Sequence, residues 1–151
     1  MTGTSDKTFV DTNVLIYAHD VDGGRKHEIA KDLLHTLWTN RSGCLSTQVL
    51  QEFYVNATRK IRKPLTKPEA RSVVDTYASW CVEGIATSDI IAAFQIEDQA
   101  RIGFWDALIV AVAVRRGARR VVSEDLNSGQ SIAGITIHNP FQERPQPRPR
   151  R

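Results

Sequence analysis

The 151-residue chain lacks the features that mark several protein classes. Its two cysteines, Cys44 and Cys81, are too few for a disulfide framework or a cysteine metal cluster, and we expect both to be reduced. The longest apolar run, Ala107–Val114, is far shorter than the roughly 20 residues of a membrane span, and the N-terminus carries no secretory signal. The four histidines are scattered without metal-ligand spacing. These absences predict a cytoplasmic protein with no membrane contact.

The sequence does contain short apolar strands that alternate with helical patterns. Four strands are expected at 8–11, 43–46, 85–87 and 119–123, and 135–137 is a candidate fifth. Such alternation predicts an α/β fold, a three-layer α/β/α sandwich with a central parallel sheet of four to five strands. We expect one domain over residues 1–141, followed by a disordered tail rich in proline and arginine at 142–151.

The intervening segments predict helices with recognisable ends. One starts at Thr12, a second runs from Lys26, and a third follows a cap at Ser46 or Thr47. Pro68 fits the first turn of a fourth helix, which is expected to reach about Cys81. Two more helices are expected, one capped by Ser88 or Asp89 and one from Phe104 or Trp105 to Arg116, ending at Gly117.

Four acidic residues lie inside apolar sequence at expected strand ends or helix starts: Asp11, Glu52, Asp106 and Asp125. Buried carboxylates are costly unless they are paired or bind a metal, and most of these have no evident Lys or Arg partner. Ligands of open α/β sheets bind beyond the carboxyl ends of the strands, where all four acids could converge. An all-carboxylate site without His or Cys selects hard ions such as Mg²⁺ or Mn²⁺.

Each of these acids taken alone has an equally good structural explanation. Asp11 could cap the helix that starts at Thr12, and Glu52 could face solvent. Asp106 could interact with the helix dipole, and Asp125 could be a turn residue. Only their joint arrangement favours a shared ion site.

In five segments the chain strongly resembles the PIN-domain ribonucleases, and within them the VapC-type toxins of bacterial toxin–antitoxin pairs. The resemblance covers nearly all of residues 8–141, and the order and spacing of the set make it specific. The segments are Val10–Tyr17, Gln48–Phe53, Phe104–Val110, Val121–Leu126 and Ile137–Phe141.

The resemblance assigns the four acids to the catalytic quartet of that family. It implies that Asp11, Asp106 and Asp125 bind the metal directly, with Glu52 acting directly or through water. Glu124 directly precedes Asp125, and either carboxylate could turn inward, but Asp125 is the position that matches the family. Alternation along a strand would place the two side chains on opposite sides.

The resemblance also implies a function and partners. Asn13 and Ser123 match positions that would orient the carboxylates or bound water. The implied activity is that of a Mg²⁺- or Mn²⁺-dependent endoribonuclease that hydrolyses RNA phosphodiesters, often in transfer or ribosomal RNA. The family further implies a homodimer and a VapB-like antitoxin that wraps the toxin and places a basic side chain in the acidic pocket.

Two groups of cations fit a polyanionic substrate held by its backbone. Solvation and favourable contact with helix C-termini explain each group better when it is taken alone. The first group is Arg59, Lys60, Arg62, Lys63 and Lys67, and the second is Arg115, Arg116, Arg119 and Arg120.

Other functions are compatible with parts of this pattern. A phosphatase with an aspartyl nucleophile at Asp11 usually has a second Asp two positions later, where this chain has Asn13. A catalytically silent PIN-like module could bind RNA or a partner without metal, although intact acids argue against it. A PIN nuclease without an antitoxin would share the chemistry. The acidic quartet itself does not distinguish RNA from DNA.

Overall fold

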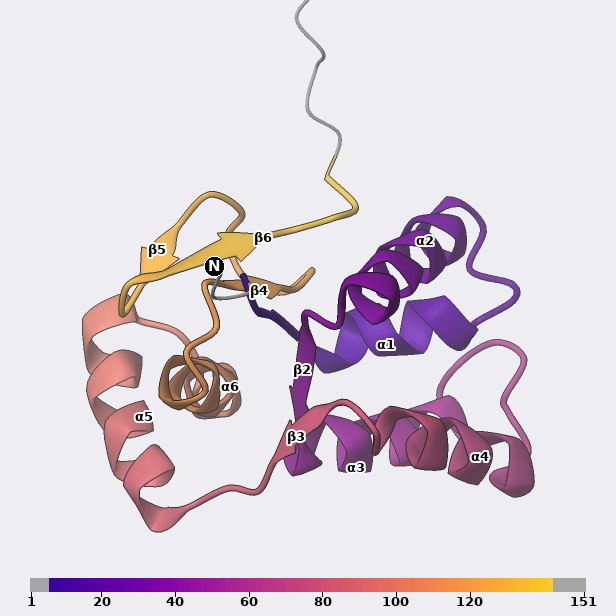
Figure 1. Cartoon of the computed structure of the whole chain (residues 1–151), viewed down its shortest axis with the longest axis horizontal. Coiled ribbons are helices and arrows are strands. Elements are labelled where there is room, and N and C mark those ends of the chain that lie inside the picture. The colour runs from indigo at the N-terminus through magenta and orange to yellow at the C-terminus, as the bar shows by residue number, and fades with distance from the viewer. Residues whose placement is uncertain (1–5, 143–151) are drawn as a thin grey trace, which may run out of the picture.

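Strands and helices alternate along the chain in the computed structural model, which describes residues 6–142 (Figure 1). The tail expected at 142–151 lies, after its first residue, outside the described residues. The elements in chain order are β1 (Thr8–Val10), α1 (Thr12–His19), α2 (Arg25–Asn40), β2 (Gly43–Ser46), α3 (Thr47–Ala57), α4 (Lys67–Tyr77), β3 (Cys81–Glu83), α5 (Thr87–Ala100), α6 (Phe104–Arg115), β4 (Arg120–Val122), β5 (Ser131–Ile132) and β6 (Ile135–His138).

The strands form one six-stranded sheet in the order β3-β2-β1-β4-β6-β5. All neighbouring strands are parallel except β5, which pairs antiparallel with β6. Figure 1 shows α5 and α6 on one side of the sheet and α1 to α4 on the other. The predicted three-layer α/β/α sandwich is therefore confirmed, with five parallel strands at its centre.

The core is formed by apolar strands and by one helix without a polar face. All three residues of β1 are buried, as expected for a central parallel strand that is covered on both sides. In α6 every residue from Ala107 to Ala113 is buried, because the helix packs against α5 and also contacts β4. No helix within residues 6–142 is long and apolar enough to cross a membrane. Cys44 is a buried free cysteine in β2.

The pairing of β1 with β4 brings distant chain segments to the same edge of the sheet. Val10 lies opposite Val122, and the strands are parallel, so both chains leave the sheet at its carboxyl edge. The backbone N–H of Asp11 donates to the carbonyl of Val122 at 3.0 Å. This register places Asp11 beside Ser123, and it fixes the position of the site described below.

The prediction of a third strand at 85–87 is wrong, because β3 occupies Cys81–Glu83. Helix α4 ends at Tyr77 instead of continuing to Cys81, which frees these residues to pair with β2. The segment after β3 is fixed by Asp89, whose carboxylate accepts a hydrogen bond from the backbone N–H of Ala86 at 2.8 Å. Helix α5 therefore starts earlier than the expected caps at Ser88 or Asp89 would allow.

The sequence patterns missed β5, which forms a tight hairpin with β6. Ala133 and Gly134 connect the two strands, and both have positive φ, at 51° and 84°. A two-residue connection with positive φ at both positions matches the right-handed twist of antiparallel strands. A strand of two residues is too short to produce an alternating pattern, so only this turn could have predicted it.

The second group of cations makes ion pairs that hold secondary structure together. Arg115, at the end of α6, donates from Nε to Asp89 at 2.7 Å and from a terminal nitrogen to Glu83 at 3.1 Å. It also donates to the carbonyl of Gly84 at 2.8 Å, and Arg116 pairs with Glu83 at 2.9 Å. Arg115 thus joins the end of α6 to the end of β3 and the start of α5.

We predict that Asp89→Ala lowers the free energy of unfolding by about 2–3 kcal/mol, because it removes a buried partner of Arg115. The bonds from Arg115 hold the pKa of Asp89 below its usual value. Its stabilising contribution is therefore present above about pH 4 and is lost as the pH falls further. Urea unfolding at pH 7 and pH 3 measures both effects. Asp98→Ala, at an exposed position of the same helix, is the control and should cost less than about 0.5 kcal/mol.

Candidate metal centre

The site is built around Asp11, which follows β1 and is buried with 5% of its surface exposed. One carboxylate oxygen accepts a hydrogen bond from the backbone N–H of Thr12 at 2.7 Å, so Asp11 does cap α1. The other oxygen accepts one from the hydroxyl of Ser123 at 2.7 Å. The capping explanation and the ion-site explanation are therefore compatible, because capping leaves the carboxylate directed toward β4.

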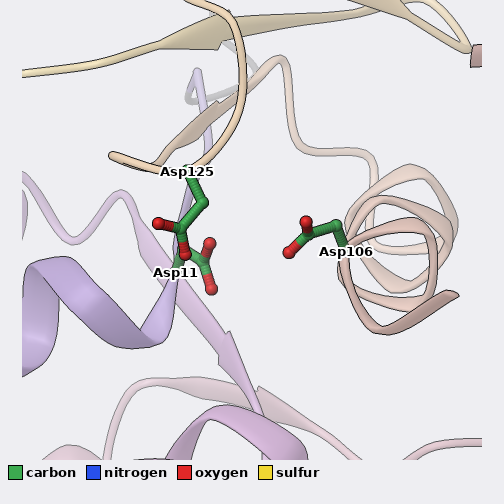
Figure 2. Close-up of side chains that lie close together, drawn as sticks. All are labelled: Asp11, Asp106 and Asp125. Atoms are coloured by element: carbon green, nitrogen blue, oxygen red, sulfur yellow. The ribbon is translucent and has the colours of Figure 1, made fainter. Parts of the chain in front are cut away.

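Asp106 and Asp125 complete a cluster with Asp11. Each of the three residues offers a carboxylate oxygen, and these oxygens lie within 4.8 Å of one another. Figure 2 shows the carboxylate of Asp106, from the first turn of α6, turned toward those of Asp11 and Asp125. Asp125 comes from the loop after β4. Within residues 6–142, no other group of His, Cys, Asp and Glu has this geometry.

The acids interact unfavourably with their surroundings and with each other. Burial raises the pKa of Asp11 to about 6, although hydrogen bonds from Ser123 and Thr12 oppose this, and Asp106 and Asp125 raise it further. Burial also raises the pKa of Asp106, with contributions from Asp125 and Glu52. The raised pKa values of these two acids indicate a cluster that lacks a nearby compensating cation.

The cluster opens into a cavity of about 250 Å³. Among the described residues, no Lys or Arg lines it. Its lining is Asp11, Thr12, Asn13, Ile16, Gln48, Glu52, Asn56, Trp105, Asp106, Ile109 and Asp125.

Glu52 lines the same cavity but lies outside the group of three aspartates. Its two oxygens accept hydrogen bonds from the Thr12 hydroxyl at 2.6 Å and from the Gln48 amide at 3.2 Å. Gln48 is buried, and its carbonyl oxygen has no hydrogen-bond partner in the part of the chain that the structure describes. Thr12 and Gln48, the two partners of Glu52, were not among the site residues predicted from the sequence. Gln48 is four positions before Glu52, so both lie on the same helix face.

Asn13 and Ser123 connect the acids through hydrogen bonds. The Asn13 amide donates to Asp125 at 3.0 Å and to Asp11 at 3.4 Å, and its carbonyl accepts from the backbone N–H of Glu124 at 3.0 Å. The Ser123 hydroxyl donates to Asp11 and accepts from the backbone N–H of Asp125 at 3.1 Å. These bonds fix the loop after β4 against the start of α1.

Lys26 and Tyr17 determine which of the two adjacent acids faces the cavity. Lys26 forms an ion pair with the carboxylate of Glu124, and the hydroxyl of Tyr17 donates to it at 3.2 Å. This interaction raises the pKa of Lys26. Glu124 is therefore held away from the cluster, and Asp125 is the acid that joins Asp11 and Asp106.

The donors fit a hard divalent cation. All three are carboxylate oxygens, and no described Lys or Arg lines the cavity that they share. Oxygen-only, anionic sites suit Mg²⁺ and Mn²⁺, whereas zinc sites commonly use His or Cys. A cation here would offset the mutual repulsion that raises the pKa values of Asp11 and Asp106.

Comparison with known proteins identifies the family. The family model of the PIN domain matches residues 8–129. The chain belongs to the PIN domain family. No curated protein matches this PIN domain in sequence.

Solved structures that resemble this PIN domain include a toxin and a toxin–antitoxin complex. A toxin–antitoxin complex from Klebsiella pneumoniae matches with a TM-score of 0.68 and 19% identity, covering 91% of this chain and 100% of that one. The DNA-bound VapBC of Salmonella typhimurium matches with a TM-score of 0.63 and 25% identity, covering 87% and 96%. VapC20 of Mycobacterium tuberculosis, a sarcin–ricin loop cleaving toxin, has a TM-score of 0.57 and 19% identity, covering 76% and 87%.

We predict that Asp11→Asn stabilises this PIN domain at pH 7 in the absence of divalent ions. The pKa of Asp11 is about 6 in the folded protein and 3.8 in the unfolded chain. The free energy of unfolding of the wild type therefore falls as the pH rises from about 4 to 6 and Asp11 ionises. The advantage of the variant over the wild type should grow by roughly 2.4 kcal/mol between pH 4 and pH 7. Urea unfolding in EDTA measures it, and saturating Mg²⁺ or Mn²⁺ should remove it.

The comparison must be made between the two proteins because His19 titrates in the same range. Burial lowers the pKa of His19 to about 4, so His19 makes the fold more stable as the pH rises from about 4 to 6.5. Both proteins retain His19, and the difference between them isolates Asp11. Asp22→Asn, at an exposed loop position, is the matched control. An Asp11→Asn effect that does not change with pH would contradict the prediction.

Proposed function

We propose that this PIN domain is a Mg²⁺- or Mn²⁺-dependent endoribonuclease, the toxin component of a VapC-type toxin–antitoxin pair. The observation that carries the proposal is the convergence of Asp11, Asp106 and Asp125 within 4.8 Å, in a cavity that no described Lys or Arg lines. The family and the toxins among the similar structures support it. The proposed site of action is the cytoplasm.

The three aspartates would hold the cation, and the other polar residues would orient them. When bound, a hard divalent ion supplies polarisation of the phosphodiester and a lowered pKa for a water molecule. Ser123 and Asn13 keep Asp11 and Asp125 directed at a common point through the bonds described above. Thr12 and Gln48 hold Glu52, which would contact a bound cation directly or through water.

Four of the five cations of the first group provide a surface for the RNA backbone. The turn at 58–66, between α3 and α4, is called here the basic turn. Its cations are exposed, and they have no ion-pair partner within residues 6–142. It begins beside the cavity, since Asn56 lines the cavity and its carbonyl accepts from the backbone N–H of Lys60 at 2.7 Å. These cations are Arg59, Lys60, Arg62 and Lys63.

RNA is the proposed substrate, and a VapB-like antitoxin is the proposed partner. VapC20 is described as cleaving the sarcin–ricin loop, and other similar structures are complexes that contain an antitoxin. By analogy we propose transfer or ribosomal RNA as the target and a homodimer as the assembly. The antitoxin would inhibit by placing a basic side chain against the aspartate cluster, where that charge would be compensated.

The proposal predicts RNA cleavage by the isolated protein with Mg²⁺ or Mn²⁺ and none with EDTA. Asp106→Asn and Asp125→Asn should each reduce the rate more than about 100-fold, beyond the 10–100-fold typical of residues that orient ligands. Glu124→Gln is the matched control for Asp125→Asn, because Lys26 and Tyr17 hold Glu124 outside the cluster. Gel analysis of a transfer RNA and a ribosomal RNA fragment measures cleavage. Equal cleavage by wild type and both Asp variants would indicate a contaminating nuclease and sink the proposal.

A second prediction concerns the basic turn. Lys60→Ala combined with Lys63→Ala should weaken RNA binding and lower the slope of log Kd against log salt by roughly 1, because about 0.7 counterions are released per phosphate neutralised on a single strand. The control removes the same charge at the amino edge of the sheet, with Lys7→Ala and Arg119→Ala. Anisotropy titrations of a labelled RNA supply both numbers. Equal loss in the two double variants would assign binding to overall charge.

A further inference from the structure

Trp105 is a large aromatic side chain that is exposed beside the aspartate cluster. It lies in the first turn of α6, immediately before Asp106, and 65% of its surface is accessible. It also lines the same cavity as Asp11 and Asp125. Tryptophan is highly buried on average in folded proteins, so exposure at the rim of a polar cavity calls for a partner that covers it.

Trp105 packs against a neighbouring ring of its own helix. Phe104 contacts it edge to face, with ring centroids 5.2 Å apart at 73°. Phe94, on α5, contacts Phe104 in turn at 5.9 Å. Phe94 is exposed to a similar degree, at 51%, but it does not line the cavity. Of these three aromatic residues, only Trp105 shares the cavity with the acids.

We propose that Trp105 stacks on a nucleobase next to the phosphodiester held at the aspartate cluster, and so selects unpaired RNA. This proposal rests on the endoribonuclease function proposed above. Trp105 and Asp106 line the same cavity, so a ligand whose phosphate reaches the carboxylates places a flanking base within reach of the indole. Base–aromatic stacking tolerates any base identity, because every base has a π-face. It also requires a base that is free of a duplex, which restricts the ligand to loops, bulges and single strands.

A protein partner is the competing occupant. Trp105, Phe94 and Ile91 are all exposed apolar residues at the α5–α6 side, and a second copy of the chain or an antitoxin could cover them together. The two occupants differ in whether they contact Phe94. A protein interface would use Phe94 and Trp105 alike, whereas a stacked base would use Trp105 alone, because Phe94 lies outside the cavity.

The test compares Trp105→Ala, Trp105→Phe and Phe94→Ala. In cleavage assays, Trp105→Ala should raise KM about 10-fold with little change in kcat, Trp105→Phe should retain most of the affinity, and Phe94→Ala should match the wild type. Mn²⁺ binding, measured by calorimetry without RNA, should be the same in all four proteins. This separates a contact with RNA from damage to the metal site.

Stacking itself is measured with a short single-stranded RNA that carries a fluorescent adenine analogue quenched by stacking. The analogue is moved through successive positions, and binding is measured on an Asp11→Asn background so that the RNA stays intact. Quenching at one position that is lost with Trp105→Ala and kept with Phe94→Ala is the expected result. A perfect duplex of the same sequence should bind at least about 10-fold more weakly than the single strand.

Failure of this inference is distinguishable from failure of the proposed function. A wild-type protein that cuts RNA, with Trp105→Ala unchanged in KM and in quenching, overturns the role of Trp105 alone. Loss of self-association or of antitoxin binding in both Trp105→Ala and Phe94→Ala, with RNA affinity unchanged, assigns the surface to a protein and overturns it as well. A wild-type protein that neither binds nor cuts RNA with Mg²⁺ or Mn²⁺ overturns both proposals.

Discussion

The carboxylate of Asp11 is held between β1 and β4, where burial opposes its charge, and the geometry of the site depends on this constraint. The parallel register of Val10 with Val122 leaves Asp11 little freedom, because its backbone N–H is bonded to β4 and its side chain to Ser123. The first turn of α1 supplies a further hydrogen-bond donor without supplying a cation. Asn13 does this with an uncharged amide, which connects Asp11 to Asp125 while leaving the negative charge of both uncompensated. The fold thereby maintains a site that favours a bound cation.

The acids can be singled out from the sequence because each signal is local. Asp11 follows a short apolar strand and Asp106 opens an apolar helix, so the residue types and their neighbours are enough to single them out. The choice between Glu124 and Asp125 could not be made this way. It depends on Lys26, which is 98 positions from Glu124 in the sequence and reaches it only because α2 packs near the loop after β4. Long-range partners of this kind leave no local pattern.

The errors in the fold have the same origin. The apolar residues near Ile85 predicted a strand, but strand position was decided by pairing with β2, which takes Cys81–Glu83. The start of α5 was decided by a bond from the backbone of Ala86 to Asp89, and Asp89 is in turn held by Arg115 from α6. A propensity pattern identifies which elements exist, whereas contacts between elements fix their ends.

The same logic separates two groups of cations that look alike in sequence. Arg115 and Arg116 are paired with Glu83 and Asp89, so their charge is largely compensated within the fold. The basic turn has no such pairs within residues 6–142, and it therefore supplies the attraction that a polyanion would experience near the cavity.

The aspartate cluster would repel the same polyanion until a cation neutralises it. Under the proposed function, metal and RNA are therefore coupled ligands, and by linkage each must tighten the binding of the other by the same factor. A basic antitoxin side chain in the cavity would compete with the cation for the cluster while leaving the basic turn charged. Inhibition of this kind would act on the coupling between metal and RNA and would not require the RNA-binding surface to be covered.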